Sequence, residues 1–383
     1  MRDAAVVGGG PAGTIAARLL AKDHDVVVLE EHPSSGVPLQ CAGLVTQKVI
    51  DMCGVSPEIL NRIRGADVIF PGGGKIEVRA KGTMALLIDR PDLDRKLAEK
   101  ASDCGAEIKY GTKYRGHRIS GSGTVLETGG EEITAKMIIG ADGYNSTVAM
   151  SLGNNLPKEY INGIQADAAH KPEHDDIMVL RLGSEIAPGF FSWEIPFGDM
   201  TRVGLCISGD SAGTPNDHLK KLLSASGIDS GEVVSRYSGK IPLGGRPISY
   251  GDRALLIGDA AGQVKPISGG GLYPICKAAP ALERTIRESI RSNDCSKKFL
   301  SRYEKRWKKE LGKEMSRGYK IRKAFVGMSD TDLENIYNIL DRDNMRKILN
   351  GIDLDNPSSI AFPMMRDPLT GFRLLPYILR AVV

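Results

Sequence analysis

The sequence predicts a chain of the α/β class, α+β overall, in which an antiparallel sheet is inserted into a parallel one and a helical region follows. Residues 3–7 and 26–30 are continuous apolar runs on either side of a glycine turn, which is typical of parallel strands buried on both faces. In 65–80 and 160–240, short alternating runs separated by Gly, Pro and Asp indicate antiparallel strands. From about 280 to 350 the pattern is helical and rich in charge.

The expected domain boundaries follow these changes of pattern. Apolar strands recur at 137–139 and 254–257, on either side of the inserted sheet, so the parallel sheet is expected to be assembled from separated segments. The strands expected in the inserted sheet include 65–70, 177–182, 190–196 and 202–207. The expected domains are a dinucleotide-binding domain of 1–64, 81–155 and 242–290, an antiparallel-sheet domain of 65–80 and 156–241, and a helical C-terminal region of 291–383.

Composition narrows the function classes. The 383 residues are 41% hydrophobic and 26% charged, which is ordinary for a globular protein with a sizeable core. The net charge of +4 does not point to nucleic acid, and no apolar run is long enough to predict a membrane span. Met1 leads directly into the first predicted strand and leaves no room for a signal peptide, so we expect a cytoplasmic location.

The cysteines do not predict a metal site. They occur at 41, 53, 104, 206, 276 and 295. No two of them form a C-x-x-C pair, and no other spacing suits zinc or an iron–sulfur cluster. In a reducing compartment we expect them to be mostly small, buried apolar residues.

The first glycine turn has the spacing of a dinucleotide fingerprint, Gly8-x-Gly10-x-x-Gly13, between a strand and a helix. The first glycine permits the tight turn, the second lets backbone approach a pyrophosphate, and the third lets the helix pack on the strand. Glu30, at the end of the second strand, can accept hydrogen bonds from ribose hydroxyls. The fingerprint alone leaves open whether the dinucleotide is FAD or NAD.

Two later motifs favour FAD. Asp142-Gly143 ends one apolar strand, and Asp259 follows another in the run Gly-Asp-Ala-Ala-Gly. Each places a carboxylate at the carboxyl end of a parallel strand, where open α/β sheets bind their ligands. Either motif alone is also compatible with an ordinary Asp turn; the three motifs in this order indicate one Rossmann-like FAD domain.

With these motifs the chain resembles the geranylgeranyl reductase family (digeranylgeranylglycerophospholipid reductase-like), within the p-hydroxybenzoate hydroxylase-like FAD-dependent oxidoreductases. The similarity covers most of the chain and is strongest at 4–45, 86–97, 136–146, 186–206 and 253–275. The resemblance implies that Asp259 holds the ribityl chain and that backbone near the pyrimidine edge stabilises the reduced flavin. It adds these cofactor contacts: Ala12, Gln40, Cys41, Gly43, Arg90, Gly269, Gly270, Gly271 and Leu272.

The loop Pro38-Leu39-Gln40-Cys41-Ala42-Gly43 matches a family loop beside the isoalloxazine at Cys41 and Gly43. Gln40 replaces the arginine usual before this cysteine, which removes a charge from that position. Cys41 is either a packed thiol or a catalytic residue that shapes the substrate position or donates the proton that C=C reduction requires. A redox pairing of Cys41 with Cys276 is a further hypothesis.

The resemblance also implies a substrate side on the inserted sheet. Phe191, Trp193 and Pro196 are read as alternating residues whose common face lines an apolar tunnel, with core packing as the alternative for each. Tyr273 follows the glycine triplet where small residues are usual, and we expect it to contact substrate.

The implied activity is an FAD-dependent reduction of double bonds in the geranylgeranyl chains of archaeal-type lipids or prenyl diphosphates. An FAD-dependent monooxygenase is the alternative, and an FAD-bearing RNA-modification or binding protein is a second one, which the weak net charge disfavours. With one fingerprint, the electron donor is expected to be external: a reduced nicotinamide, a quinol-type carrier or a ferredoxin-like protein. The basic stretch 297–323 and the apolar end 372–380 are interpreted either as ordinary surface and core or as docking sites for a redox protein and a membrane surface.

Overall fold

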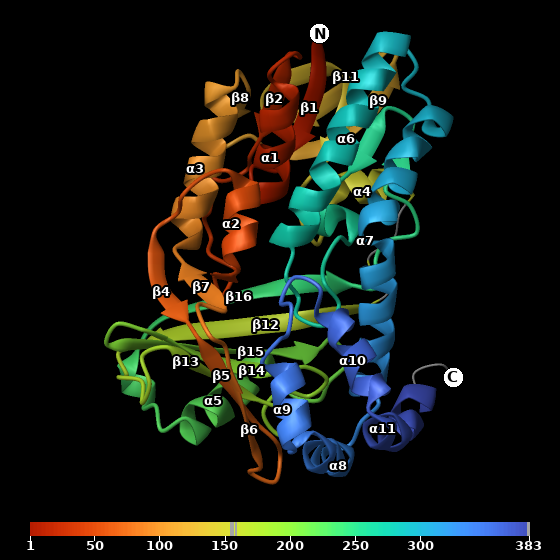
Figure 1. Ribbon diagram of the computed structural model, residues 1–383. Coiled ribbons are helices and arrows are strands. Elements are labelled where there is room, and N and C mark those ends of the chain that lie inside the picture. Colours follow the sequence, from red (N-terminus) through yellow and green to blue (C-terminus); the bar gives the residue numbers. More distant parts are fainter. Residues whose placement is uncertain (154–156, 158, 381–383) are drawn as a thin grey trace.

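The computed structural model describes residues 1–153, 157 and 159–380. Figure 1 shows two large sheets, one in the upper and one in the lower half of the molecule, with the long helix α7 (Lys297–Val326) running beside both. The α/β class expected from the sequence is confirmed.

The upper sheet carries the parallel strands of the dinucleotide fold. The order β18-β11-β1-β2-β8 joins strands that are all parallel to their neighbours. The strands are β1 (Arg2–Val7), β2 (Val26–Leu29), β8 (Glu107–Lys109), β11 (Glu132–Gly140) and β18 (Ala254–Leu256). β1 and β2 are almost completely buried over Ala4–Val7 and Val26–Leu29, as expected for strands covered on both faces. Antiparallel partners extend the sheet: β17 (Tyr250–Gly251) pairs with β18, and β9 (Tyr114–Ser120) and β10 (Gly123–Thr128) form a hairpin on β11.

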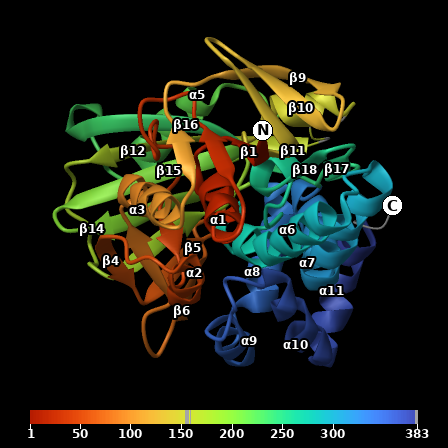
Figure 2. The same cartoon turned by 90° about the horizontal axis from the view of Figure 1, so that it is seen from above.

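Helices from three separate parts of the chain cover this sheet. They are α1 (Pro11–Leu20), α3 (Arg90–Asp103) and α6 (Leu272–Ser292). Figures 1 and 2 both place α1 and α6 side by side. Their apolar side chains form one core with the strands, for example Ile15, Leu97 and Leu282 with Val6 and Val28. The apolar face of α6 therefore explains why a segment after residue 270 returns to the first domain.

The lower sheet follows the order β16-β12-β15-β14-β13-β5-β6. Its strands are β5 (Gly65–Ile69), β6 (Lys75–Arg79), β12 (Glu159–Ala168), β13 (Ile177–Arg181), β14 (Ser192–Phe197), β15 (Met200–Ser208) and β16 (Val233–Leu243). The four expected strands are confirmed, but the expectation of a purely antiparallel sheet is wrong at one junction. β5 and β13 are parallel because the early β5–β6 hairpin adds to the edge of a later meander, and two strands far apart in the chain need not alternate in direction.

A third, small sheet lies between the two large ones and was not expected. It has the order β3 (Leu44–Val45), β7 (Ala85–Ile88), β4 (Ile59–Ile63), and α2 (Gln47–Cys53) follows β3. Its side chains Leu87 and Ile63 pack with Ile195 of β14, so it joins the upper half to the lower sheet.

The C-terminal region is helical, as expected. After α7 come α8 (Asp330–Leu340), α9 (Asp343–Leu349), α10 (Ala361–Arg366) and α11 (Pro368–Arg380). Short helices elsewhere are α4 (Thr147–Ser151) and α5 (Pro215–Ala225). Among the residues that the structure describes, no helix combines the length and apolarity needed to cross a bilayer.

Candidate cofactor and substrate site

The glycine turn after β1 needs its glycines for three different reasons. Gly8 has φ +103°, and a Cβ there would overlap the carbonyl oxygen of Ala141. A Cβ at Gly13 would overlap the carbonyl oxygen of Gly8, so this glycine allows α1 to pack against the turn. Gly10 differs, because a Cβ there would meet no atom within 4 Å. The space beside Gly10 is open on the side where the sequence predicts a pyrophosphate.

The N-terminus of α1 is suited to an anion. The backbone N–H groups of Gly10, Ala12 and Gly13 donate no hydrogen bond within the described ranges. The N-cap Gly10 offers no side chain, and the first turn contains no acidic residue. Unpaired N–H groups and the positive end of the helix dipole together form the kind of site that binds phosphate.

Glu30 lies buried directly after β2. Its Oε2 accepts a hydrogen bond from the Gly9 N–H at 2.7 Å, and its Oε1 accepts one from the His32 N–H at 2.9 Å. The His32 ring Nδ1 is 2.6 Å from the same Oε1. Glu30 therefore fixes the glycine turn, a role that the sequence did not indicate. Its predicted contact with ribose stays a prediction, for which Oε2 has a further lone pair.

Asp142 is occupied locally. Its carboxylate accepts hydrogen bonds from Ser146 Oγ at 2.5 Å and from the Val148 N–H at 3.1 Å, which holds the start of α4. Burial raises the pKa of Asp142, against these hydrogen bonds. Gly143 has φ +74° and turns the chain toward α4. Direct cofactor contacts of Asp142 and Gly143 remain predictions, whereas their support of the turn beside Gly8 is structural.

Asp259 has a different environment. The preceding Gly258 lies between helices α1 and α6, since a Cβ there would be 2.8 Å from Ala12 Cβ and 3.4 Å from Ile275 Cγ1. Among the described residues, none donates a hydrogen bond to the Asp259 carboxylate. Desolvation raises the pKa of Asp259 to about 6, although the charge of Arg90 opposes the rise. A partly buried carboxylate without a donor fits hydroxyl groups of a bound cofactor.

The glycine triplet leads into α6. Gly269 has φ +71°, and a Cβ there would be 3.2 Å from Ile241 Cδ1 of the lower sheet. The N–H groups of Gly270, Gly271 and Leu272 donate no backbone hydrogen bond within the described part of the chain. This second helix N-terminus therefore faces the junction between the two large sheets with its donors free.

The loop with Cys41 lies beside Arg90, the first residue of α3. The Arg90 guanidinium donates to both oxygens of Asp94, at 3.0 and 3.3 Å, and its Nε is buried without a partner in the described structure. Burial acts to lower the pKa of Arg90, but Asp94 and the adjacent Cys41 thiol hold it above its ordinary value. A Cβ at Gly43 would overlap the carbonyl oxygen of Ile88, which brings this loop against β7.

The other side of the loop is held by the lower sheet. Gln165 Nε2 of β12 donates to the Cys41 carbonyl at 3.0 Å, and Arg202 Nη1 of β15 donates to the Ala42 carbonyl at 2.9 Å. Arg202 and Asp167 are both buried and form a bidentate ion pair at 2.7 and 3.0 Å. Gln40 packs on Gly239 of β16, since a Cβ at Gly239 would be 3.4 Å from Gln40 Cβ, so Gln40 contacts protein on at least one side.

The proposed pairing of Cys41 with Cys276 is wrong in this structure. Cys276 Sγ lies 3.8 Å from Cys53 Sγ, and both thiols are buried between α2 and α6. Cys41 instead receives the Gly43 N–H at 3.4 Å and lies beside Arg90. Cys276 projects from the helix into the core of the upper half, which the sequence spacing alone could not reveal.

The predicted substrate residues divide between two faces of β14. Phe191 and Trp193 are half-buried and belong to an apolar cluster with Ile161, Phe190 and Val264, next to the glycine triplet. Pro196 lies an odd number of residues from Trp193 on a strand without a bulge, so it points to the opposite face. The expectation that all three share one face is therefore wrong for Pro196.

Tyr273 lies in the first turn of α6 and is buried. Lys48 Nζ lies 4.9 Å from its ring centroid, and the ammonium groups of Lys265 and Lys277 lie at 6.0 Å. Tyr273 is thus surrounded by cations, and its contact with substrate remains a prediction.

Sequence reasoning missed a buried lysine beside the glycine triplet. A Cβ at Gly270 would be 3.4 Å from Lys265 Nζ, which donates to the Leu354 carbonyl at 2.7 Å and lies 3.6 Å from Asp355 Oδ1. Burial lowers the pKa of Lys265, and Asp355 opposes this. Asp355 also accepts from Thr46 Oγ1 at 2.8 Å. A charged residue inside the apolar and glycine-rich run 260–272 was the available signal.

The sequence also did not indicate Gln165 and Arg202, because their role is to hold a loop that is distant in sequence.

Some polar atoms at the site have no partner. Gln165 Oε1 and Trp193 Nε1, like Arg90 Nε, are buried polar atoms without partners in the described structure. Such atoms are uncommon in folded proteins, and here they are available to form hydrogen bonds with a bound group or water. The open space at Gly10, the two free helix N-termini, Asp259 and these atoms together fit a dinucleotide with a polar ring.

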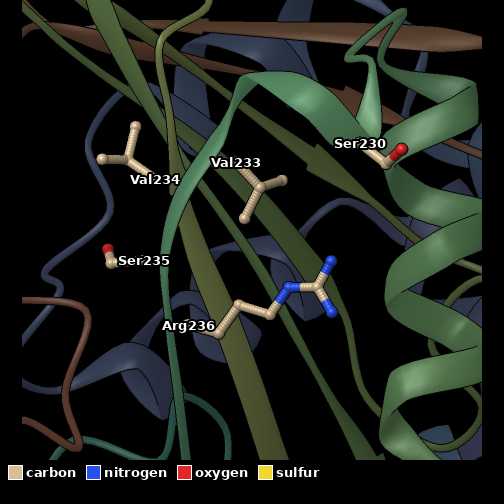
Figure 3. A pocket seen from close by; sticks show the side chains of 5 residues that line it. All are labelled: Ser230, Val233, Val234, Ser235 and Arg236. Carbon is tan, nitrogen blue, oxygen red and sulfur yellow. The ribbon is translucent and has the colours of Figure 1, made fainter.

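A surface hollow elsewhere does not share these features. It has a volume of about 340 Å³ and is lined by Ser230, Val233, Val234, Ser235 and Arg236 (Figure 3). It lies at the start of β16, and its lining residues on the strand are about 10–20 Å from Gly239 and the Gln40 loop. None of the predicted site residues lines it.

The basic stretch expected at 297–323 lies on α7. Part of its charge is already paired: Arg306 with Glu288 at 2.6 Å, and Lys308 with Glu304 at 2.7 Å. The basic side chains of this stretch that are exposed and make no ion pair within the described residues include Lys297, Lys298, Lys305 and Lys309.

Comparison with known proteins identifies the family. A family model described as an FAD binding domain matches residues 1–306. Digeranylgeranylglycerophospholipid reductase 2 of Methanothermobacter thermautotrophicus is 31% identical, with 98% of this chain and 99% of the relative covered. The protein of the same name from Methanopyrus kandleri is 32% identical, with 91% and 93% covered.

A solved structure agrees in fold. The crystal structure of a geranylgeranyl bacteriochlorophyll reductase-like protein from Thermoplasma acidophilum has a TM-score of 0.83 and 22% identity, covering 98% of this chain and 99% of that one. The match extends over both large sheets and the C-terminal helices. The chain therefore belongs to the digeranylgeranylglycerophospholipid reductase family, with an FAD-binding domain and FAD as its cofactor.

Proposed function

We propose that this protein is an FAD-dependent oxidoreductase that saturates C=C bonds in the geranylgeranyl chains of archaeal-type isoprenoid lipids or of prenyl diphosphates. The observation that carries the proposal is the junction of the two sheets. There, the free N-terminus of α6 and the carboxylate of Asp259 lie next to an apolar cluster with Phe191 and Trp193. A Cβ at Gly271 would be 3.2 Å from Asp259 Oδ1, and one at Gly269 would be 3.8 Å from Phe190 Cζ of that cluster. Family membership gives the reaction class, and the apolar cluster suits a hydrocarbon substrate.

Three segments would hold the cofactor. The N–H groups of Gly10, Ala12 and Gly13 would bind the pyrophosphate, and Glu30 would bind the adenosine ribose. Asp259 would accept hydrogen bonds from the ribityl hydroxyls, and the N–H groups of 270–272 would meet the pyrimidine edge of the ring. When bound and reduced, FAD supplies the hydride.

The chain's own residues supply the proton. Reduction of an isolated double bond forms two C–H bonds, one from the hydride and one from a proton donor. Cys41 carries a partly exposed thiol. Its loop is held on one side by β7, through the Ile88 N–H to the Gly43 carbonyl, and on the other by Gln165 and Arg202 of the lower sheet. We assign Cys41 as the proton donor, with Arg90 beside it as a positioning residue.

Substrate binding depends on the aromatic strand. Phe190 and Phe191 are stacked with ring centroids 4.3 Å apart, and Trp193 meets Phe191 edge-on at 6.4 Å. Such a wall would pack against a polyprenyl chain and exclude water from the reacting carbons. Tyr273 would contact the substrate from the α6 side.

Electrons come from an external donor, either a ferredoxin-like protein or a reduced nicotinamide. The exposed lysines of α7 give an acidic redox protein a complementary surface. The protein works in the cytoplasm as a peripheral protein at the membrane, where its lipid substrate is found.

The test is an anaerobic assay of the purified holoprotein with a chemical reductant and a digeranylgeranyl lipid. We expect each saturated bond to add two mass units to the product, and we expect Cys41→Ala to retain FAD but lose most of this activity. An oxygenated product in air, with no saturation without oxygen, would assign the protein to the monooxygenases instead. Protein that neither carries nor takes up FAD would refute both.

A further inference from the structure

The last two helices expose an unusual set of side chains. Every described side chain of 361–377 that is exposed to solvent is apolar or an arginine. We call this set the C-terminal ridge; it consists of Phe362, Pro363, Met365, Arg366, Leu369, Phe372, Arg373 and Pro376. Phe372 is 77% exposed and Phe362 64%, with Leu369 at 48% and Met365 at 40%. Single exposed apolar residues are normal, but a contiguous apolar patch marks a binding surface.

The ridge is the outer face of a packed helix pair. Its four large apolar residues form two pairs, Phe362 and Met365 on α10 and Leu369 and Phe372 on α11, and the members of each pair are three residues apart, on one side of their helix. The opposite side is buried, with Met364 at 8% and Thr370 at 0% exposure. Figure 1 shows α10 and α11 at the lower end of α7, beside α8. The ridge is thus not needed to close the core of the described chain.

Charge on the ridge is of one sign. The guanidinium of Arg366 lies 4.4 Å from the ring centroid of Phe362, and Arg373 follows Phe372 directly. The acidic residue of this segment, Asp367, is turned toward the protein: it accepts from Thr370 Oγ1 at 2.5 Å and from Asn344 Nδ2 at 3.0 Å. Aromatic residues beside arginines suit the boundary between anionic headgroups and acyl chains.

The ridge is joined directly to the candidate site. Leu354 packs against the same buried cluster as Trp193 and Ala42, and its carbonyl accepts the hydrogen bond from Lys265 beside the glycine triplet. Only the short 3₁₀ helix Pro357–Ile360 separates this segment from α10. Ser358 in that turn is fixed to Glu314 of α7, with its N–H at 3.0 Å from Oε1. A partner bound to the ridge would therefore contact a segment that leads directly to the substrate side of the site.

We propose that the C-terminal ridge docks on an anionic lipid bilayer, with its aromatic side chains at the headgroup–acyl boundary and its arginines on the headgroups. This inference rests on the proposed function, because it identifies the face through which a membrane-embedded prenyl chain reaches the site. A second copy of the chain could also cover an apolar patch, but a ridge that carries only cations is poorly suited to pair with itself.

The experiment uses FAD-loaded full-length protein and flotation with vesicles of phosphatidylglycerol or of phosphatidylcholine. We expect binding to the anionic vesicles, and we expect Phe362→Ser/Phe372→Ser to weaken it by on the order of tenfold or more. Arg366→Gln/Arg373→Gln should weaken binding at low salt and lose the preference for anionic lipid. Val234→Ser, which changes a 66% exposed apolar residue on β16, is the matched control and should bind like the unchanged protein.

Two results would overturn the proposal. One is vesicle binding that the ridge variants leave unchanged. The other is a dimer of the unchanged protein, seen by light scattering, that Phe362→Ser/Phe372→Ser converts to a monomer. An assay of the reduction of a detergent-dispersed prenyl substrate distinguishes a failure of the docking surface from a failure of the proposed function. Ridge variants should retain this reductase activity. If the unchanged protein lacks the activity but still binds vesicles through the ridge, the reductase assignment is refuted and the docking surface is supported.

Discussion

The two sides of the candidate site are held in different ways. On the pyrophosphate side, glycines and backbone N–H groups shape the site around Gly8, Gly10 and Gly13. On the ring and substrate side, the loops lie against largely buried ion pairs. These are Arg90–Asp94, Arg202–Asp167 and Lys265–Asp355. The first side depends on the absence of side chains and the second on charged ones, so the two should fail differently when they are mutated.

The largest effect is expected on the glycine side. In Gly13→Ala the new Cβ would overlap the Gly8 carbonyl oxygen, and neither backbone can move without separating α1 from the turn. We expect loss of FAD and a destabilisation of about 3 kcal/mol or more, measured by denaturant unfolding. Gly10→Ala is the matched control, because its Cβ meets no protein atom: it should fold normally and still bind FAD weakly. Equal FAD content in both variants and the unchanged protein would contradict this account.

On the charged side, the Arg202–Asp167 pair should give the next largest effect. Arg202→Met leaves the Asp167 carboxylate buried without its partner and releases the Ala42 carbonyl. We expect a loss of about 3–5 kcal/mol in the free energy of unfolding. The double variant Arg202→Met/Asp167→Leu removes both charges and should recover part of that loss. If the double variant is less stable than Arg202→Met, the loss in the single variant is not caused by an unpaired buried charge on Asp167.

Substitutions of Cys41 test whether the loop held on the charged side places a proton donor in the site. As the proton donor, Cys41→Ala should lower the rate of lipid reduction by about 10²-fold, with FAD binding and stability nearly unchanged. The rate of Cys41→Ser should lie between those of Cys41→Ala and the unchanged protein, because a hydroxyl can donate a proton but is a weaker acid than a thiol. Cys104→Ser, at the end of α3 and away from the loop, is the control. An unchanged rate in Cys41→Ala would leave Cys41 as a packed thiol only.

The same contrast explains what could be predicted from sequence. The glycine side is local: a strand, a turn and a helix within 30 residues specify Gly8, Gly10, Gly13 and Glu30, and the structure explains each glycine by a contact or by the open space beside it. Asp259 was found in the same way, from a motif at a strand end, whereas the glycine triplet was implied by the family resemblance. The α/β class and the strands of the inserted sheet follow from periodicity alone.

The charged side could not be predicted because its contacts join distant segments. Nothing near Gln165 or Arg202 in sequence indicates that they hold the loop of Cys41. The parallel pairing of β5 with β13 and the contact of Cys276 with Cys53 are likewise set by tertiary packing. Pro196 is a different case, since the period of two along a strand excludes it from the face of Trp193 and the sequence was sufficient to show this.

Asp259 gives the smallest effect and links the two sides. The preceding Gly258 lies between α1 and α6, and the charge of Arg90 acts on the Asp259 carboxyl. Its pKa in the folded protein without FAD is raised to about 6, from 3.8. The folded state then holds a proton that the unfolded state has lost, so stability falls as the pH rises from about 4 to about 6. Allowing for partial exposure of the carboxylate, we expect a loss of about 1–2 kcal/mol.

The measurement compares the FAD-free protein with Asp259→Asn by denaturant unfolding at pH 4.5 and 7, on the order of one unit either side of the raised pKa. The variant has no carboxyl to ionise, so its advantage over the unchanged chain should be larger at the higher pH. Added FAD should reverse the order, since ribityl hydroxyls can donate to the ionised Asp259 and not equally well to an amide. If the stability difference between the two proteins is the same at both pH values, Asp259 already has a partner in the free protein. The carboxylate of Asp259 would then be hydrogen-bonded within the protein before FAD binds.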